Sequence, residues 1–297
     1  MRKTIFGAFI IFVLTGIGAG WYLTLPMRLP PGVMAERAAD AARGEAVFLA
    51  AGCASCHAAP GAEGAARLIL SGGQRFPSDF GTFVAPNISP HPEAGIGGWS
   101  LPDFADAVMR GVSPEGRHYY PAFPYGAYGR ADPQDIADLW AYLMTLPPDA
   151  TPSQPHEVGF PFSVRRGLGL WKRLFLRPGW VVEGPLSPEA TRGRYLAEAL
   201  GHCGECHTPR GLLGQLQTGL WLSGAPNPTG EGRIPDITPA GLDWSDADLV
   251  GYFQTGFTPD FDSAGGHMAE VIGNLSQLPE RDIAAIAAYL KAVPPIP

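Results

Sequence analysis

Two copies of the pattern Cys-x-x-Cys-His constrain most strongly what this chain of 297 residues can fold into. They occupy Cys53–His57 and Cys203–His207, and together they contain all four cysteines of the chain. The pattern is typical of covalent attachment of a c-type haem, in which two thiols form thioethers with the porphyrin and the histidine binds the iron. We therefore expect two covalently bound haem groups, held by Cys53, Cys56, His57, Cys203, Cys206 and His207.

Two other chemistries use paired cysteines. In zinc sites built from two Cys-x-x-Cys knuckles, the knuckles usually lie roughly 15–20 residues apart. Here about 150 residues separate the pairs, and a histidine follows each pair directly. Two disulfides would each close a ring over two residues, and such rings are usually redox-active rather than structural. The motifs therefore favour haem over a zinc site or dithiol chemistry.

The N-terminus carries an apolar segment. Met1–Lys3 is basic, and no charged residue follows from Thr4 to Leu25. As a helix, these 22 residues reach about 33 Å, which is enough to cross a bilayer. A cleaved signal peptide has a shorter apolar core and small residues at its cleavage site, and Ile17–Ala19 is a poor version of that site. We predict that residues 1–28 form a membrane anchor rather than a cleaved signal, with the haem domains on the periplasmic side.

The sequence repeats itself around the two motifs. Three pairs of segments correspond: Arg43-Gly44 with Arg192-Gly193, Asn87–Pro90 with Asp236–Pro239, and Gly98–Ser100 with Asp243–Ser245. Each repeat also ends in apolar residues at helical spacing, followed by two prolines that end the helix. These residues are Ile136, Leu139, Trp140 and Leu143 in the first repeat, and Ile283, Ile286, Ala287 and Leu290 in the second. Each repeat is thus predicted to be an opening helix, a haem motif, a loop region and a closing helix.

The repeats suggest domain boundaries. We predict one domain over residues 38–148 and another over residues 186–297, each large enough to wrap one porphyrin. Residues 149–185 are predicted to connect them, and their first part is rich in Pro and Ser. Residues 160–180 carry five basic residues among Phe and Trp. These either pack between the domains or contact lipid headgroups or an acidic partner.

Several of these segments resemble the multihaem cytochrome c subunits of membrane-bound bacterial alcohol, gluconate and sorbitol dehydrogenases. The resemblance is carried by Asn87–Ser100, Tyr120–Tyr125, Phe160–Arg166, Arg192–Arg210 and Ala287–Leu290, and covers most of the chain from about residue 38 onward. It implies an all-α fold of two tandem class I cytochrome c domains, each wrapping one covalent haem, after an N-terminal transmembrane helix. The family commonly has three haem domains and often lacks such an anchor, so this chain would be a two-haem, anchored relative.

The ligand on the far side of each iron is usually methionine or a second histidine. Met268 is the candidate in the second repeat, in the loop before the closing helix, with His267 beside it as a competitor. Extending the repeat without a gap places Phe123 on Met268, and the resembled family likewise has methionine in that segment. Phenylalanine has no lone pair for iron. The sequence leaves three outcomes for the first haem, namely no protein ligand, His118, or water.

The function that the resemblance implies is electron transfer rather than catalysis. The net charge of −7 gives no indication of a nucleic-acid partner. We expect a carrier at the bacterial inner membrane, which accepts electrons from a dehydrogenase or quinol and passes them to a downstream acceptor or oxidase. The expected partners are a periplasmic dehydrogenase, a quinol-oxidising complex or a terminal oxidase. The alternative is a peroxidase-like or ligand-binding protein with an open first haem, for which His118 and Glu115 are the nearby acid–base candidates.

Overall fold

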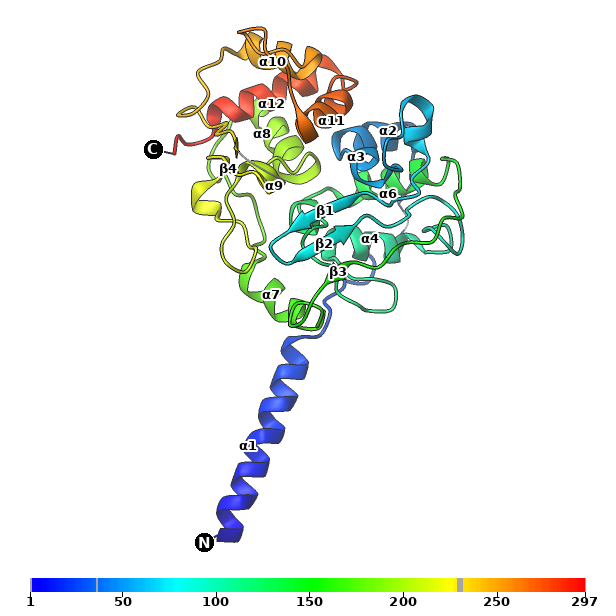
Figure 1. The fold of residues 1–297 in the computed structure, drawn as a ribbon, viewed down its shortest axis with the longest axis vertical. Coiled ribbons are helices and arrows are strands. Elements are labelled where there is room, and N and C mark those ends of the chain that lie inside the picture. The colour runs from blue at the N-terminus through cyan, green and yellow to red at the C-terminus, as the bar shows by residue number, and fades with distance from the viewer. Residues whose placement is uncertain (1, 36, 229–231, 297) are drawn as a thin grey trace.

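A computed structural model describes residues 2–35, 37–228 and 232–296 of the chain. One long helix, α1 (Arg2–Leu23), projects from the rest of the molecule as a stalk, with the N-terminus at its free end (Figure 1). Its segment Thr4–Leu23 is long and apolar enough to cross a membrane, and none of it is buried against other parts of the chain. The apolar N-terminal segment is therefore a single exposed helix, as its composition predicts.

Helices of the first repeat surround the first Cys-x-x-Cys-His motif. They are α2 (Ala41–Ala50), α3 (Cys53–His57), the 3₁₀ turn η1 (Gly64–Leu68), α4 (Leu101–Arg110), α5 (Tyr125–Tyr128) and α6 (Pro133–Leu143). Helices α2 and α6 pack very closely, because a Cβ atom on Gly44 would lie 2.0 Å from the backbone oxygen of Asp138. The predicted apolar face of α6 is confirmed, since Ile136, Leu139 and Leu143 are buried.

The second repeat has the same plan. Its helices are α8 (Pro188–Arg194), the π-helical turn η2 (Tyr195–Leu200), α9 (Gly204–His207), the 3₁₀ turn η3 (Thr218–Leu220), α10 (Asp246–Thr255), α11 (Gly266–Leu275) and α12 (Glu280–Ala292). Helices α8 and α12 are pressed together at Gly193, where a Cβ atom would lie 1.8 Å from the backbone oxygen of Ala285. Ile283, Ile286 and Leu290 are buried, which confirms the closing helix.

Helices α4 and α10 begin and end with the same signals. The hydroxyl of Ser100 accepts a hydrogen bond from the backbone N–H of Asp103. In return, the carboxylate of Asp103 accepts one from the backbone N–H of Ser100. Ser245 and Asp248 form the same reciprocal cap on α10. Such capping boxes satisfy N–H groups that the first turn of a helix leaves without partners. The repeated Trp-Ser segments thus mark two equivalent helix starts.

Within the described residues, five short strands depart from the predicted all-α fold, although helices dominate. Strands β1 (Arg75–Ser78), β2 (Gly81–Val84) and β3 (Glu157–Val158) form an antiparallel sheet in that order, with Phe76 opposite Phe83. Strand β4 (Ala225–Pro226) pairs with β5 (Arg233–Ile234). An alternating pattern cannot be recognised over so few residues, which is why the strands left no signal in the sequence.

The predicted linker is fixed against the first repeat at its start. The side chain of Asn87 donates hydrogen bonds to the carbonyl oxygens of Asp149 and Thr151, at 2.8 and 2.9 Å. The backbone N–H of Asn87 donates to the hydroxyl of Ser153 at 3.0 Å. Further along, α7 (Gly167–Phe175) lies at the base of the molecule, where α1 enters it (Figure 1). The segment therefore connects the stalk to both repeats.

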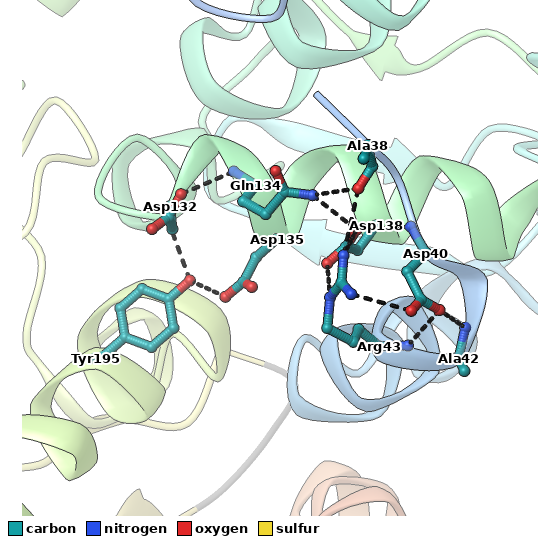
Figure 2. Close-up of polar contacts among 9 residues, drawn as sticks. All are labelled: Ala38, Asp40, Ala42, Arg43, Asp132, Gln134, Asp135, Asp138 and Tyr195. Atoms are coloured by element: carbon teal, nitrogen blue, oxygen red, sulfur yellow. Dashed lines mark hydrogen bonds and ion pairs between the residues drawn. The ribbon is translucent and has the colours of Figure 1, made fainter. Parts of the chain in front are cut away.

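A polar network joins α2, α6 and the second repeat (Figure 2). The guanidinium of Arg43 binds the buried carboxylate of Asp138, with Nε at 2.7 Å and the second nitrogen at 2.9 Å. One turn away, the hydroxyl of Tyr195 donates to Asp135 and accepts the backbone N–H of Asp132 at 3.1 Å. Tyr195 begins η2, so the second repeat is tied to the closing helix of the first.

Candidate functional site

The first Cys-x-x-Cys-His motif forms helix α3, directly after the opening helix α2. The ring of His57 is held by a backbone carbonyl, because its Nδ1 lies 2.9 Å from the oxygen of Pro86. Burial lowers the pKa of His57, which keeps the imidazole neutral. A neutral ring that donates from Nδ1–H to a carbonyl has its lone pair on Nε2. His57 therefore presents Nε2 as a ligand atom.

The second motif carries the same arrangement in helix α9. Nδ1 of His207 lies 2.8 Å from the carbonyl oxygen of Pro235. Burial again lowers the pKa of His207, so this ring is also neutral and also presents Nε2. The two histidines are far apart in the sequence but are oriented in the same way, each by the carbonyl of a proline in the loop that follows its motif.

These features fit a haem better than a zinc cluster. A metal-bound histidine usually donates its other ring N–H to a carbonyl or carboxylate, as both rings do here. All four thiols are free. Within the described residues, no group of three or more His, Cys, Asp or Glu side chains is placed to hold a metal ion. Burial raises the pKa of Cys53 to about 12 and that of Cys56 to about 11, so both sulfurs are uncharged thiols at neutral pH.

The segments that precede Phe123 and Met268 share one backbone register, at a constant offset. An isolated β-bridge joins Val112 to His118 in the first repeat and Phe257 to Ser263 in the second. Inside each bridge, a backbone hydrogen bond of 2.8 Å closes the turn, from the N–H of Ser113 to Arg117 and from the N–H of Thr258 to Asp262. A second backbone bond of 2.8 Å runs from the N–H of Tyr119 to Gly111 and from the N–H of Ala264 to Gly256. The register continues to Phe123 and Met268, whose N–H groups donate to the carbonyl three residues earlier, at 3.1 and 3.2 Å. The register therefore pairs Phe123 with Met268, as the repeat predicts, but the backbones diverge just before them, because Gly266 has a φ of 55° and its counterpart Pro121 is held at about −65°.

Met268 lies in the first turn of α11 and not in a loop, so the predicted loop is wrong. Met268, Ile272 and Leu275 follow helical spacing, and the last two are buried, which holds α11 on the core. The Met268 side chain is half-buried and packs against that core. His267 is exposed, and its ring centroid lies 6.1 Å from that of Phe76 in the first repeat. The geometry thus favours Met268 over His267 as the inward-facing donor.

His118 is engaged at the anchor side of the first repeat. Its Nε2 lies 3.1 Å from the carbonyl oxygen of Thr24, just beyond the end of α1. Burial lowers the pKa of His118, and the backbone contact with Thr24 only partly offsets this. Glu115, the other acid–base candidate, forms an ion pair with Arg117 at 3.4 Å. Nε2 of His118 is thus turned toward Thr24 while its buried Nδ1 has no partner among the described residues, and Glu115 is an exposed carboxylate paired with Arg117.

The two motifs are in contact with each other's repeat. The hydroxyl of Tyr128 donates to the carbonyl of Ala51, just before the first motif, at 3.2 Å. The ring of Tyr128 packs edge-on against His202, which directly precedes the second motif, with centroids 5.6 Å apart. Asn274 of α11 donates to the hydroxyl of Ser55 at 2.7 Å. Sequence patterns named none of these residues, because contacts between repeats leave no local signal.

The buried carboxylate of Glu198 binds groups from several segments around the second motif. Glu198 accepts the backbone N–H groups of Val181 and Val182, at 2.6 and 3.0 Å, and the hydroxyl of Tyr289 at 2.6 Å. Tyr289 in turn accepts the indole N–H of Trp221 at 3.0 Å. The connecting segment, the opening helix and the closing helix therefore meet at one acidic side chain, which sits in an otherwise apolar stretch of sequence.

Comparison with known proteins agrees with this geometry. The sequence profile of the family described as cytochrome c matches residues 41–147. The chain is 56% identical over 296 residues to a protein named diheme cytochrome c-type from Cereibacter sphaeroides, and the match covers all of both chains. It is 41% identical to the fructose dehydrogenase cytochrome subunit of Gluconobacter japonicus, over 85% of this chain and 52% of that subunit. It is also 35% identical to an alcohol dehydrogenase (quinone) cytochrome c subunit of Gluconobacter oxydans, over 86% of this chain and 55% of that subunit. The chain thus spans about half the length of these dehydrogenase subunits.

Proposed function

The chain belongs to the family of dihaem c-type cytochromes, and from this membership we propose that it carries electrons at a membrane and is not itself an enzyme. Residues 38–148 and 186–297 are proposed as two tandem class I cytochrome c domains, each around one covalent haem. Residues 1–28 are the membrane anchor, and residues 149–185 connect the domains. The donor is a dehydrogenase or quinol, and the acceptor is a downstream carrier or oxidase.

The proposed haem ligands follow the two motifs. The first haem is held by Cys53, Cys56 and His57, and the second by Cys203, Cys206, His207 and Met268. The observation that carries the assignment is the matched pair of contacts from Nδ1 of His57 to Pro86 and from Nδ1 of His207 to Pro235. When bound, the haem supplies an iron that cycles between two oxidation states.

The protein orients the ligands of each proposed haem and sets the reduction potential of its iron. A hydrogen bond from Nδ1–H to a carbonyl fixes the imidazole plane and makes Nε2 a stronger donor. A thioether ligand at Met268 favours the reduced state relative to a second histidine. Buried surroundings at His207 keep water away from the ligand atoms. These roles suit a carrier, in which the protein sets potentials and distances and performs no bond chemistry.

The contacts of the two acid–base candidates, His118 and Glu115, favour a carrier over a peroxidase. Peroxide cleavage needs a side chain that can move a proton above an open iron. His118 points its Nε2 at the carbonyl of Thr24, and Glu115 is paired with Arg117. With Nε2 of His118 directed at Thr24 and Glu115 on the surface, the described residues supply little support for peroxide chemistry.

The contacts between the repeats support electron transfer within the molecule. Tyr128 contacts a residue just before each motif, namely Ala51 before the first and His202 before the second. The bond from Asn274 to Ser55 joins the helix of Met268 to the first motif. Side chains of the two repeats thus touch between the two proposed haem sites, which supports a short path from one to the other.

Contacts between the end of α1 and the segment around α7 support a position of the haem domains close to the membrane. The guanidinium of Arg166 lies 3.5 Å from the ring centroid of Trp21 and donates to its carbonyl at 3.0 Å. Arg173 donates to the carbonyl of Leu23 at 2.8 Å. These cations bind the carbonyl end of α1, where a helix dipole favours positive charge. The connecting segment therefore binds the carbonyl end of the anchor directly.

The proposal is tested on the full-length protein purified in detergent. Mass spectrometry is expected to find two covalent haem groups, and replacing Cys203 and Cys206 by serine should remove one of them. The matched control is Glu205→Ala, which changes the same motif but keeps both thiols. Both haems are expected to become reduced when the protein is mixed with a quinol, with no sustained consumption of peroxide. A single haem in the wild type, or peroxide turnover without electron transfer, would contradict the proposal.

A further inference from the structure

We propose that the first haem has no sixth ligand from the protein and that this open position binds a neutral diatomic molecule, such as carbon monoxide or nitric oxide. The inference rests on the proposed attachment of that haem at Cys53–His57. It gives one of the two haems a ligand-binding activity beyond electron transfer, while Met268 closes the second haem to the same molecules.

The first reason is the shared backbone register. Phe123 and Met268 follow the same bridge and the same turn, and each donates its N–H to the carbonyl three residues earlier. In the second repeat this position presents a thioether sulfur. A phenyl ring in any rotamer lacks a lone pair that could bind iron. The register of the repeat therefore pairs an inert side chain in the first copy with a donor in the second.

The second reason is what surrounds Phe123. Its neighbours are aromatic rings, with centroids of Tyr119, Tyr128 and Tyr125 at 6.2, 5.8 and 6.5 Å. A cavity of about 70 Å³ adjoins it on the side of the second repeat, and its lining includes Phe123, Tyr125, Arg130, His202, Glu205 and Trp221. A water molecule needs roughly 10–15 Å³ of such space, so a diatomic molecule has room.

Tyr125 adds an independent observation about the same cavity. Its hydroxyl is buried and has no hydrogen-bond partner in the part of the chain that the structure describes. Buried hydroxyls are nearly always paired, and each exception calls for an explanation. A small molecule in the cavity would give this hydroxyl an acceptor. The cavity thus combines an inert ring, a free volume and an unused donor.

Other donors in the first repeat are poorly placed to take the position of Phe123. Met109 on α4 stands where the second repeat has Gln254, and Met144 after α6 stands where it has Lys291. Neither position holds a ligand in the second repeat. His118 is directed at Thr24. His202 lines the cavity, so the experiment below includes it.

The test titrates carbon monoxide into the reduced full-length protein, after its haem content has been measured by mass. The wild type is expected to bind about one equivalent per chain, with one high-spin and one low-spin haem. Phe123→Met should abolish the uptake and make the first haem low-spin. Phe123→Leu, which also lacks a lone pair, is the matched control and should still bind about one equivalent. Met268→Ala should raise the uptake to about two equivalents.

Three results would overturn the inference. One is a wild type with two low-spin haems and no uptake. Another is uptake that appears only after His118→Ala or His202→Ala, because that histidine would then be the ligand. The third is a Phe123→Met protein that still binds carbon monoxide at the first haem. A chain with fewer than two covalent haems would instead contradict the proposed function, and the haem mass shows this before any gas is added.

Discussion

Asn274, in the helix that carries Met268, donates a hydrogen bond of 2.7 Å to the hydroxyl of Ser55, between the two cysteines of the first motif. The two residues lie 219 positions apart in the sequence. An ion pair between Arg67 and Glu270 joins the same helix to the turn that follows the first motif. Helix α11 is therefore a physical link between the two proposed haem sites.

Removing this bond should loosen the contact between the repeats. Asn274→Ala is expected to lower the free energy of unfolding by about 1 kcal/mol, the usual net contribution of one such bond. Ser55→Ala should have a similar effect. The double variant should lose little more than either single variant, as measured by denaturant unfolding of the full-length protein. Fully additive losses would show that the bond contributes nothing.

Replacing Met268 should lower the potential of the second haem alone. Met268→His exchanges a thioether for an imidazole, which favours the oxidised state. A spectroelectrochemical titration should show one of the two midpoints moving to a lower value while the other stays in place. Met109→Leu, a change at a buried methionine of the first repeat, is the control and should move neither. An unchanged pair of midpoints in Met268→His would remove this residue from the ligand set.

Asp138 should make the fold sensitive to acid. Burial alone raises the pKa of Asp138, but hydrogen bonds from Arg43, Gln134 and the backbone of Asp40 hold it below its usual value of 3.8. The carboxylate therefore stabilises the fold fully above that pH, and the stabilisation is lost as the pH falls through the lowered pKa. Asp138→Asn should cost about 1–3 kcal/mol at neutral pH.

The difference between Asp138→Asn and the wild type should shrink in acid, because the wild-type carboxyl is then protonated as well. Urea unfolding at neutral pH and in acid measures both values. Asp103→Asn, which changes an exposed cap residue on α4, is the control at neutral pH. A cost that is the same at both pH values would show that the charge of Asp138 is unimportant.

Lys172 should make stability rise with pH. Its Nζ donates to the carbonyls of Arg110 and Gly111, both at 2.7 Å, and lies 4.4 Å from the ring centroid of Tyr125. Burial lowers the pKa of Lys172 from 10.5 to about 7. Between these values the unfolded chain holds more protons than the folded chain, so the free energy of unfolding increases with pH.

Lys172→Met should remove this rise, and it should also weaken the end of α4, where the lysine caps two carbonyls. Thermal unfolding of the full-length protein between pH 7 and pH 10 measures the slope. Lys291→Met is the control, at a lysine whose Nζ donates to the single carbonyl of Trp244 among the residues described. Parallel pH profiles for wild type and Lys172→Met would contradict the expectation.

Several parts of the structure could be predicted because their signals are local. Apolar spacing located α6 and α12, and the repeated segments around Ser100 and Ser245 proved to be matching helix starts. The correspondence of Phe123 and Met268 followed from the same repeat and is confirmed by shared backbone bonds. The roles of the cysteines and histidines as haem ligands stay predictions.

Other parts lacked a local signal. Tyr128 meets His202, and Asn274 meets Ser55, only because the two repeats fold against each other. Helix α11 was missed for a different reason. Its residues were expected to form the loop before the closing helix, but the helix begins at Gly266 and its apolar residues are spaced to cover the core.

The common register of residues 100–123 and 245–268 has a consequence for how such a chain can change over time. Both copies keep the same cap, turn and bridge, so the folding of the segment depends little on the last side chain. One copy of the segment can therefore carry a phenyl ring and the other a sulfur while both keep the same cap, turn and bridge. The effect of a sulfur and of a phenyl ring at this position can therefore be compared within one molecule and under the same solution conditions.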